Sequence, residues 1–499
     1  MKKSILAYTF AALTTALLFL VSGAVYVSAQ LGTGDSGKSE VGSISIESSV
    51  KRTIKKKPVK PRVTPKPIVR PAANKTGEQY EDLGEQLYKQ KNYDDALVAY
   101  QNAVKKKPSL AHSHYRIGWI YNDREEYDDA LLALNQALRY DTSSYEIYLE
   151  KGYALRRLGR TDEALPALNQ ALELQSDSYI ANYELGALYN DKKEYETAIT
   201  YLRRAIQLKS DYAAAYDELG QSQWRLGRYS AAINSYNQAL NINPNYGNAY
   251  LGLGDVNLFG TKDYKQAIYY YEKGVQYDTD NEIAFYNIGW AYNELQNYSQ
   301  AIPWLNKAVQ FRPNYPAAYF ELGWANYKLK QSSQAIAAFQ KAADLKPDYS
   351  PAYMGLGDVY YDNIKDYQTA ADYYSKGLLL SPKNANALYR LAYCYSELRR
   401  YQDCEITIKR FLDLKPEHAW GHFLLAYSYQ QRSRYSEAAT SYRNVIRYDN
   451  DNDRAHYNLG LVYVELGNRN GAINEYKELQ RLKSEYTQNL YTKIYGKSY

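Results

Sequence analysis

The histidines are the residues of this 499-residue chain whose spacing could hold a metal ion. His418 and His422 are four residues apart, which would place both rings on one face of a helix, and His112 and His114 form a second close pair. However, His114, His422 and His456 all occupy one position of a repeated pattern, where other copies of the pattern carry Tyr or Phe. We therefore interpret them as substitute aromatic packing residues, with zinc binding as the minor alternative.

Other reactive side chains also follow the repeated pattern. Cys394 and Cys404 occupy positions that hold small residues in the other copies, so we expect two buried thiols without a disulfide bond. Gly252 and Gly254 resemble a phosphate-binding loop only superficially, because no strand precedes them. No nucleophile, base and acid come together, so we predict no catalytic residue, no cofactor and no metal site, and hence no enzyme.

The pattern that positions these side chains recurs about every 34 residues from Gly77 onward. With Gly77 as position 1, apolar and small residues at positions 4, 7, 8 and 11 share one face of a first helix, and those at positions 20, 24 and 27 share one face of a second helix. Position 8 is Gly84, Gly118, Gly152, Gly186, Gly220, Gly254, Gly289, Gly323, Gly357, Ala392, Ala426 and Gly460. Position 20 is Ala96, Ala130, Ala164, Ala198, Ala232, Ala267, Ala301, Ala335, Ala370, Cys404, Ala438 and Ala472. The sequence thus predicts twelve helical hairpins, in which Gly at position 8 faces Ala at position 20.

Two features mark the ends of the predicted helices. Six prolines should stop the second helices: Pro108, Pro244, Pro313, Pro347, Pro382 and Pro416. Units six and nine share Gly-Leu-Gly-Asp, at 252–255 and 355–358, and each carries one extra residue before its second helix. We expect the extra residue to bulge the turn inside these two hairpins.

This pattern over residues 77–486 resembles the tetratricopeptide repeat (TPR) family. The resemblance implies an all-α, right-handed superhelical solenoid of about twelve helix-turn-helix hairpins, with a concave groove lined by the first helices. Residues 487–499 are expected to form a C-terminal capping helix.

The same resemblance implies that positions 2, 5, 9, 12 and 13 of the first helices face a ligand. These positions give an aromatic partner-binding groove: Trp119, Tyr153, Trp224, Tyr286, Trp290, Phe320, Trp324, Tyr327, Tyr361, Tyr393, Trp420 and Tyr427. Their polar members include Arg156, Arg157, Asp217, Asp255, Glu294, Asp358 and Glu397. Any one aromatic ring could instead pack on the adjacent first helix. We expect Trp290 and Trp324 to contact a partner, because they hold the same position in consecutive repeats.

The residues before the repeats differ sharply in composition. Residues 1–29 are predicted to be a signal peptide cleaved after Ala29, with an uncleaved N-terminal anchor at residues 5–29 as the alternative. Residues 30–76 are predicted to be a disordered linker, in which residues 51–75 hold ten Lys and Arg, five Pro and no acid. That segment is either a spacer or a site of attachment to anionic lipid or cell-wall polymer.

The charge distribution separates the tail from the repeats. Residues 1–76 carry 13 Lys and Arg against 3 Asp and Glu, a net charge of +10, while the whole chain carries +6, so the remainder carries −4. A mildly acidic repeat body excludes a nucleic-acid partner. The sequence therefore predicts an exported, periplasmic or extracellular bacterial scaffold that binds other proteins through peptides or helices. Glycan or cell-wall polymer binding by the same aromatic groove is the alternative.

Overall fold

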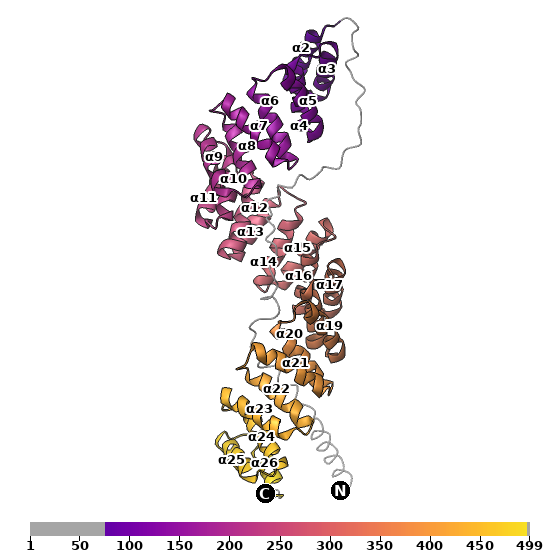
Figure 1. Ribbon diagram of the computed structural model, residues 1–499, viewed down its shortest axis with the longest axis vertical. Helices are drawn as coiled ribbons and strands as arrows, with labels where there is room; N and C mark the ends of the chain where they lie inside the picture. The colour runs from indigo at the N-terminus through magenta and orange to yellow at the C-terminus, as the bar shows by residue number, and fades with distance from the viewer. Residues whose placement is uncertain (1–74, 497–499) are drawn as a thin grey trace, which may run out of the picture. The chain divides into compact units, whose positions relative to one another are not determined.

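The computed structural model describes residues 75–496 (Figure 1). Within this range the chain forms 25 α-helices and two π-helical segments, and no strand. The predicted all-α solenoid of about twelve TPR hairpins is confirmed. The predicted signal peptide, residues 1–29, and residues 30–74 of the predicted linker lie outside the described residues.

The helices alternate between the first and the second helix of each repeat unit. The first helices are α2 (Gly77–Lys89), α4 (Ala111–Asp123), α6 (Tyr145–Arg157), α8 (Tyr179–Asp191), α10 (Ala213–Arg225), α12 (Gly247–Asp255), α14 (Glu282–Glu294), α16 (Pro316–Lys328), α18 (Ser350–Asp358), α20 (Ala385–Glu397), α22 (Ala419–Gln431) and α24 (Asp453–Glu465). The second helices are α3 (Tyr93–Lys106), α5 (Tyr127–Tyr140), α7 (Thr161–Leu174), α9 (Tyr195–Leu208), α11 (Tyr229–Ile242), α13 (Tyr264–Gly274), α15 (Tyr298–Phe311), α17 (Ser332–Leu345), α19 (Tyr367–Leu380), α21 (Tyr401–Leu414), α23 (Tyr435–Tyr448) and α25 (Arg469–Arg481). A last helix, α26 (Thr487–Tyr495), follows them.

The described residues divide into two compact bodies, residues 75–295 and residues 296–496. The first body holds α2 to α14, and the second holds α15 to α26. Within the described residues, no helix is long and apolar enough to cross a lipid bilayer.

Short polar side chains begin several of the first helices. The Ser178 hydroxyl accepts a hydrogen bond from the backbone N–H of Ala181 at 3.2 Å, and the Asn384 carbonyl accepts one from the N–H of Ala387 at 2.8 Å. These bonds satisfy donors that the first turn of a helix leaves without a backbone partner. The cap residue therefore sets where each of these helices starts.

The tight crossing of the two helices in a hairpin depends on the small residues at positions 8 and 20. Position 20 is fully buried in all twelve units. Position 8 meets the large side chain at position 24, because a Cβ on Gly323 would lie 2.6 Å from Cδ1 of Phe339 and a Cβ on Gly186 would lie 2.5 Å from Cγ of Leu202. The predicted contact of Gly with Ala is thus refined: the missing side chain at position 8 makes room for a ring or a leucine at position 24.

The turn between the two helices has the same geometry in regular and enlarged units. In regular units position 15 adopts the left-handed conformation, as in Lys91 with a φ of 59° and Gly159 with a φ of 74°. In units six and nine Lys262 and Lys365 adopt it one residue later. Non-glycine residues in this conformation cost energy, and the packing of both helices against neighbours holds them there.

The extra residue of units six and nine lies in the first helix, so the predicted bulge in the turn is wrong. The π-helical segments η3 (Val256–Thr261) and η4 (Val359–Ile364) directly continue α12 and α18. A π-helical turn takes up one additional residue while the chain stays helical. The turn and the second helix therefore keep their normal register.

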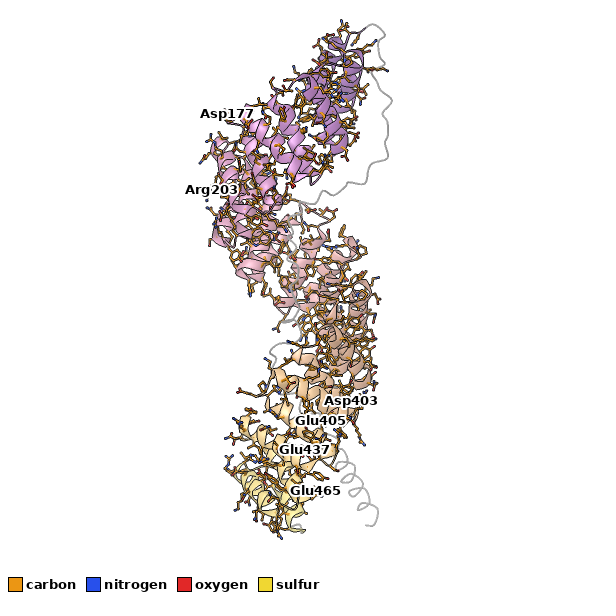
Figure 2. All side chains as sticks on the ribbon, in the orientation of Figure 1. Asp177, Arg203, Asp403, Glu405, Glu437 and Glu465 are labelled. Carbon is orange, nitrogen blue, oxygen red and sulfur yellow. The ribbon has the colours of Figure 1, made fainter. Side chains whose placement is uncertain are left out.

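An ion cluster connects α21 to the turn between α22 and α23. Figure 2 labels two of its carboxylates, Glu405 and Glu437. Glu405 is only 8% exposed and pairs with Lys409 at 2.8 Å, with Arg434 at 3.0 Å and with Arg432. Burial pushes the pKa of Glu405 upward, but the three cations outweigh it and lower the pKa. Arg434 also pairs with Glu437 at 2.8 Å, so the charges of this cluster satisfy one another within the fold.

Candidate interaction surface on the first helices

The first helices pack against one another along each body. In the first body α4 contacts α6, α6 contacts α8, and α8 contacts α10, while in the second body α16 contacts α18 and α20 contacts α22. We call the side chains at positions 2, 5, 9, 12 and 13 of these helices, together with those at position 6 that adjoin them, the first-helix face. This face holds the residues that the sequence predicted to bind a partner.

Seven of the twelve predicted groove residues are buried. They are Trp224, Tyr286, Phe320, Trp324, Tyr327, Tyr361 and Tyr393. Their exposed fractions range from 3% for Tyr286 to 8% for Tyr327, so their rings offer little surface to a partner. The alternative interpretation, that a ring packs within the array, fits these seven better.

The other five predicted residues keep part of their surface. They are Trp119, Tyr153, Trp290, Trp420 and Tyr427. Each has an aromatic neighbour on one side, as Trp290 has Phe259 with ring centroids 5.5 Å apart and Trp420 has Phe423 at 5.3 Å. A ring that is supported on one side and open on the other is a rigid contact group with little conformational freedom to lose on binding.

Trp324 differs from Trp290, although the sequence predicted the same role for both. Trp324 is 4% exposed, its ring centroid lies 5.5 Å from that of Tyr327, and the Lys328 ammonium lies 4.6 Å from its ring centroid. Its burial leaves little area for the predicted partner contact. Trp290 and Trp324 belong to different bodies, and Trp290 remains the more accessible of the two.

Polar pairs join consecutive first helices in the first body. Each pair links position 12 of one unit to a carboxylate at position 6 of the next: Asn122 to Glu150 at 2.7 Å, Arg156 to Glu184 at 2.7 Å, and Asn190 to Glu218 at 2.8 Å. Arg156 also reaches Asp191 at 3.3 Å. Because the same spacing recurs three times, α6, α8 and α10 present a row of carboxylates.

Tyrosines border this row of carboxylates. The ring centroids of Tyr183 and Tyr212 lie 5.1 Å apart in an edge-on arrangement. Burial raises the pKa of both phenols, and the negative charges of Glu184 and Glu218 raise it further. These phenols therefore stay neutral beside the carboxylates.

The carboxyl group of Glu150 has a strongly raised pKa. Burial raises its pKa from 4.5 to about 7, and repulsion by Glu184 adds to the shift, while the hydrogen bond from Asn122 opposes it. An amide donor carries no charge, so it stabilises the carboxylate less than a cation would. Near neutral pH Glu150 is consequently divided between its protonated and its ionised form.

Two carboxylates of the second body, Asp358 and Asp362, have a cation in contact. Arg390 on α20 lies 3.3 Å from Asp358 and 2.6 Å from Asp362, and Tyr374 donates a hydrogen bond to Asp358 at 2.6 Å. Burial raises the pKa of Asp358, and Arg390 opposes that rise. For Asp362 burial acts in the same direction, but Arg390 and the hydroxyl of Tyr327 together lower the pKa. This arrangement resembles a satisfied structural network.

The histidines and cysteines have structural surroundings. Three histidines hydrogen-bond through Nε2 to the backbone carbonyl oxygen six residues earlier in the chain: His114 at 2.9 Å, His422 at 2.8 Å and His456 at 3.0 Å. Cys394 and Cys404 are buried free thiols, as predicted, and burial raises the pKa of both. Among the described residues, no three His, Cys, Asp or Glu side chains gather in a way that could hold a metal ion.

The carboxylates at position 6 were missed by the sequence prediction, which considered positions 2, 5, 9, 12 and 13. A signal for them exists. An Asn or Arg stands 28 residues before each of the three carboxylates Glu150, Glu184 and Glu218. Because the repeat is 34 residues long, this spacing joins position 12 of one unit to position 6 of the next. That spacing brings position 6 of one first helix beside position 12 of the preceding one.

Family models for tetratricopeptide repeats match most of the described chain. One matches residues 81–145, 149–213, 312–350 and 320–378, a second matches 365–427 and a third matches 453–486. A model described as TPR repeat matches residues 225–258, 289–330 and 428–467. Between residues 81 and 486 these matches omit only 146–148, 214–224 and 259–288.

Several solved structures are similar to parts of the chain. YrrB, described as a TPR protein with an unusual peptide-binding site, aligns with 38% of this chain and 95% of its own at 23% identity and a TM-score of 0.36. The MamA protein aligns with 33% of this chain and 91% of its own at 26% identity and a TM-score of 0.31. The Cut9–Hcn1 hetero-tetramer of APC/C aligns with 85% of this chain and 97% of its own at 14% identity and a TM-score of 0.37. No curated protein matches the chain.

Proposed function

Because the chain belongs to the tetratricopeptide repeat family, we propose that it is a non-catalytic scaffold of the cell envelope that binds extended or helical segments of other proteins on its first-helix face. The observation that carries the proposal is the set of five partly exposed aromatic residues on this face, of which Trp290, Trp420 and Tyr427 are members. Partly exposed Trp and Tyr are the side chains that most often dominate the energy of protein–protein contacts.

The interaction test removes exposed rings without touching the buried ones. We expect a Trp290→Ala, Trp420→Ala, Tyr427→Ala variant to lose at least about tenfold in partner affinity, since each lost anchor costs on the order of 1–2 kcal/mol. The measurement is quantitative capture of crosslinked partners from the native envelope, followed by titration of the purified partner.

A matched control removes an exposed ring elsewhere. Tyr269 lies on second helix α13 and is 52% exposed, so Tyr269→Ala should leave capture unchanged. Equal capture by the wild type and by the triple variant would remove the first-helix face from the proposal. Quenching of tryptophan fluorescence by cell-wall fragments, lost in the same variant, would indicate a glycan occupant instead.

The envelope location is supported by the composition of residues 1–29, which have two Lys at the start and a long apolar run after them. Fractionation of cells that produce the full chain tests this part independently. Recovery of the protein with the cytoplasmic fraction, at its full length, would refute the location and leave the binding proposal intact.

A further inference from the structure

The first body contains a polar strip that the exposed aromatic rings do not explain. It consists of Glu150 on α6 and Glu218 on α10, with Glu184 of α8, which is 5% exposed and paired with Arg156, between them, and it is bordered by Tyr183 and Tyr212. We call these five residues the acidic strip. Carboxylates between tyrosine rings are suited to Lys and Arg, which can form a charged hydrogen bond and lie against an aromatic face.

The chain itself shows that Tyr212, at the border of the strip, accepts a cation. The Lys209 ammonium lies 4.7 Å from the ring centroid of Tyr179 and 5.7 Å from that of Tyr212. The ring of Tyr212 also lies 5.2 Å from that of Tyr179. The border of the acidic strip is therefore already organised for cation–aromatic contact.

Asn122 provides a separate indication that a hydrogen-bond donor is missing. Asn122 is 4% exposed, and within residues 75–496 its buried Oδ1 atom has no hydrogen-bond partner. Its Nδ2 atom donates to the backbone carbonyl of Glu150 at 3.1 Å and to the Glu150 carboxylate at 2.7 Å. Rotating the amide by half a turn would place its oxygen against these two acceptors, so the orientation is determined and Oδ1 needs a donor from elsewhere.

Glu150 needs the same kind of group. Among the described residues it forms no ion pair, and its only side-chain partner is the uncharged amide of Asn122. Glu150 is half-buried, and a carboxylate withdrawn from water without a cation gains stability when a Lys or Arg pairs with it. A single Lys or Arg side chain beside Asn122 and Glu150 could therefore donate hydrogen bonds to both the Asn122 oxygen and the Glu150 carboxylate.

We propose that the acidic strip binds the chain's own basic segment, residues 51–75. This inference deepens the proposed function, since it uses the same first-helix face and names one of its occupants. The segment carries ten Lys and Arg and no acid, opposite in charge to the strip. With five prolines it has less conformational freedom to lose on binding than an ordinary chain of its length.

The connection between segment and strip is long enough. Residue 75 lies two residues before α2 begins, and 25 residues of extended chain reach about 75 Å at roughly 3.1 Å each. Packed helices lie about 10 Å apart, so the distance from α2 to α10 across four neighbouring first helices is on the order of 40 Å. Binding within one chain would compete with any basic partner for the strip.

The experiment compares two full-length chains. In the neutral-segment chain, all ten Lys and Arg of residues 51–75 are replaced by Gln. A fluorescein-labelled peptide of the wild-type sequence 51–75 is titrated against each chain, and binding is followed by fluorescence anisotropy at low and high salt. The neutral-segment chain should bind the peptide roughly tenfold or more tightly than the wild type, because its strip is not occupied by its own segment. High salt should weaken that binding.

The acidic strip is tested in the neutral-segment chain. Glu150→Gln with Glu218→Gln should weaken peptide binding by roughly tenfold, because both changes keep the side-chain shape and remove the charge. Glu163 and Glu196 on second helices are 59% and 62% exposed, so Glu163→Gln with Glu196→Gln should change the affinity less than about twofold. Circular dichroism of each variant shows that it is folded, and Glu150→Gln alone repeats the test with the smallest perturbation.

Several outcomes would overturn the inference: equal peptide affinity for the two chains, no binding to the neutral-segment chain, or binding that the strip variant leaves unchanged. Partner capture separates this failure from failure of the proposed function. If the peptide does not bind but the Trp290, Trp420 and Tyr427 variant still loses partners, the first-helix face recruits other proteins and not its own segment. If the peptide binds and partner capture is unchanged in the variant without those three rings, the acidic strip binds the chain's own segment and the proposed role of the exposed rings fails.

Discussion

The first-helix face of α4–α10 and that of α16–α20 follow one repeat frame and contain different groups. In the second body this face is filled by buried rings, among them Phe320, Trp324 and Tyr393, and two carboxylates, Asp358 and Asp362, contact Arg390. In the first body carboxylates recur at position 6, and Glu150 has only an amide partner. The comparison indicates that the repeat determines where a side chain lies, whereas its neighbours 28 residues away determine whether it serves the fold or remains available to a ligand.

The largest effect is expected from removing the cation of the second body. Arg390→Leu should lower the free energy of unfolding by about 3–5 kcal/mol, because the buried Asp358 and the half-buried Asp362 would be left without a positive partner. Urea unfolding followed by circular dichroism measures the change. Arg400, 45% exposed in its pair with Asp403, provides the control, and Arg400→Leu should cost no more than about 1 kcal/mol.

A change below about 1 kcal/mol in Arg390→Leu would show that water or a rearranged side chain compensates the two carboxylates. Asp358 and Asp362 would then tolerate the absence of a cation as Glu150 does, and the proposed difference between the carboxylates of the two bodies would be wrong.

An intermediate effect should be common to both bodies, because it concerns the shared repeat frame. Gly186→Ala and Gly323→Ala should each lower the free energy of unfolding by about 1–3 kcal/mol, since the new methyl group would lie within 2.6 Å of Leu202 or Phe339. Thermal and urea unfolding of both variants measure it. A cost in one body and none in the other would mean that the helix crossing is not equivalent in the two bodies.

The sequence predicted the helices well because their signals are local and repeated. Every first helix begins at position 1 of the frame, and the second helices of the six Pro-containing units end two residues before Pro108, Pro244, Pro313, Pro347, Pro382 and Pro416. Twelve copies average out the irregularities of any single unit. The same averaging concealed the π-helical segments, because one additional residue can lie in a turn or in a helix at nearly equal cost from sequence alone.

The candidate site was predicted less well, because burial on the first-helix face depends on neighbouring repeats. Trp290 and Trp324 share position 9, yet only Trp290 keeps appreciable surface. Glu150, in contrast, lies at position 6, which the sequence prediction did not include, and its hydrogen bond with Asn122 joins it to the first-helix face. Contacts between units, which a periodic pattern does not encode, decide both cases.

The smallest effect has opposite signs in the two bodies. The folded state raises the pKa of Glu150 from 4.5 to about 7, so below about pH 4.5 the carboxyl is protonated in both folded and unfolded chains. As pH rises from about 4.5 to about 7, the unfolded chain loses this proton first, and the folded state becomes relatively less stable. Glu150→Gln removes that loss and should stabilise the protein by about 1–2 kcal/mol at pH 8 and by almost nothing at pH 4.

Asp362→Asn should act in the opposite direction at pH 8, because Arg390 and the hydroxyl of Tyr327 lower the pKa of Asp362 in the folded state, and its ionised form therefore stabilises the fold above the unfolded pKa. Urea unfolding of both variants at pH 4 and pH 8 distinguishes the two environments. A carboxylate kept for binding destabilises the empty fold, so its neutral variant gains stability while it loses affinity for a basic peptide. If Glu150→Gln destabilised the protein at pH 8, the ionised carboxylate of Glu150 would stabilise the fold as that of Asp362 does, and the acidic strip would be a structural element of the fold with no binding role.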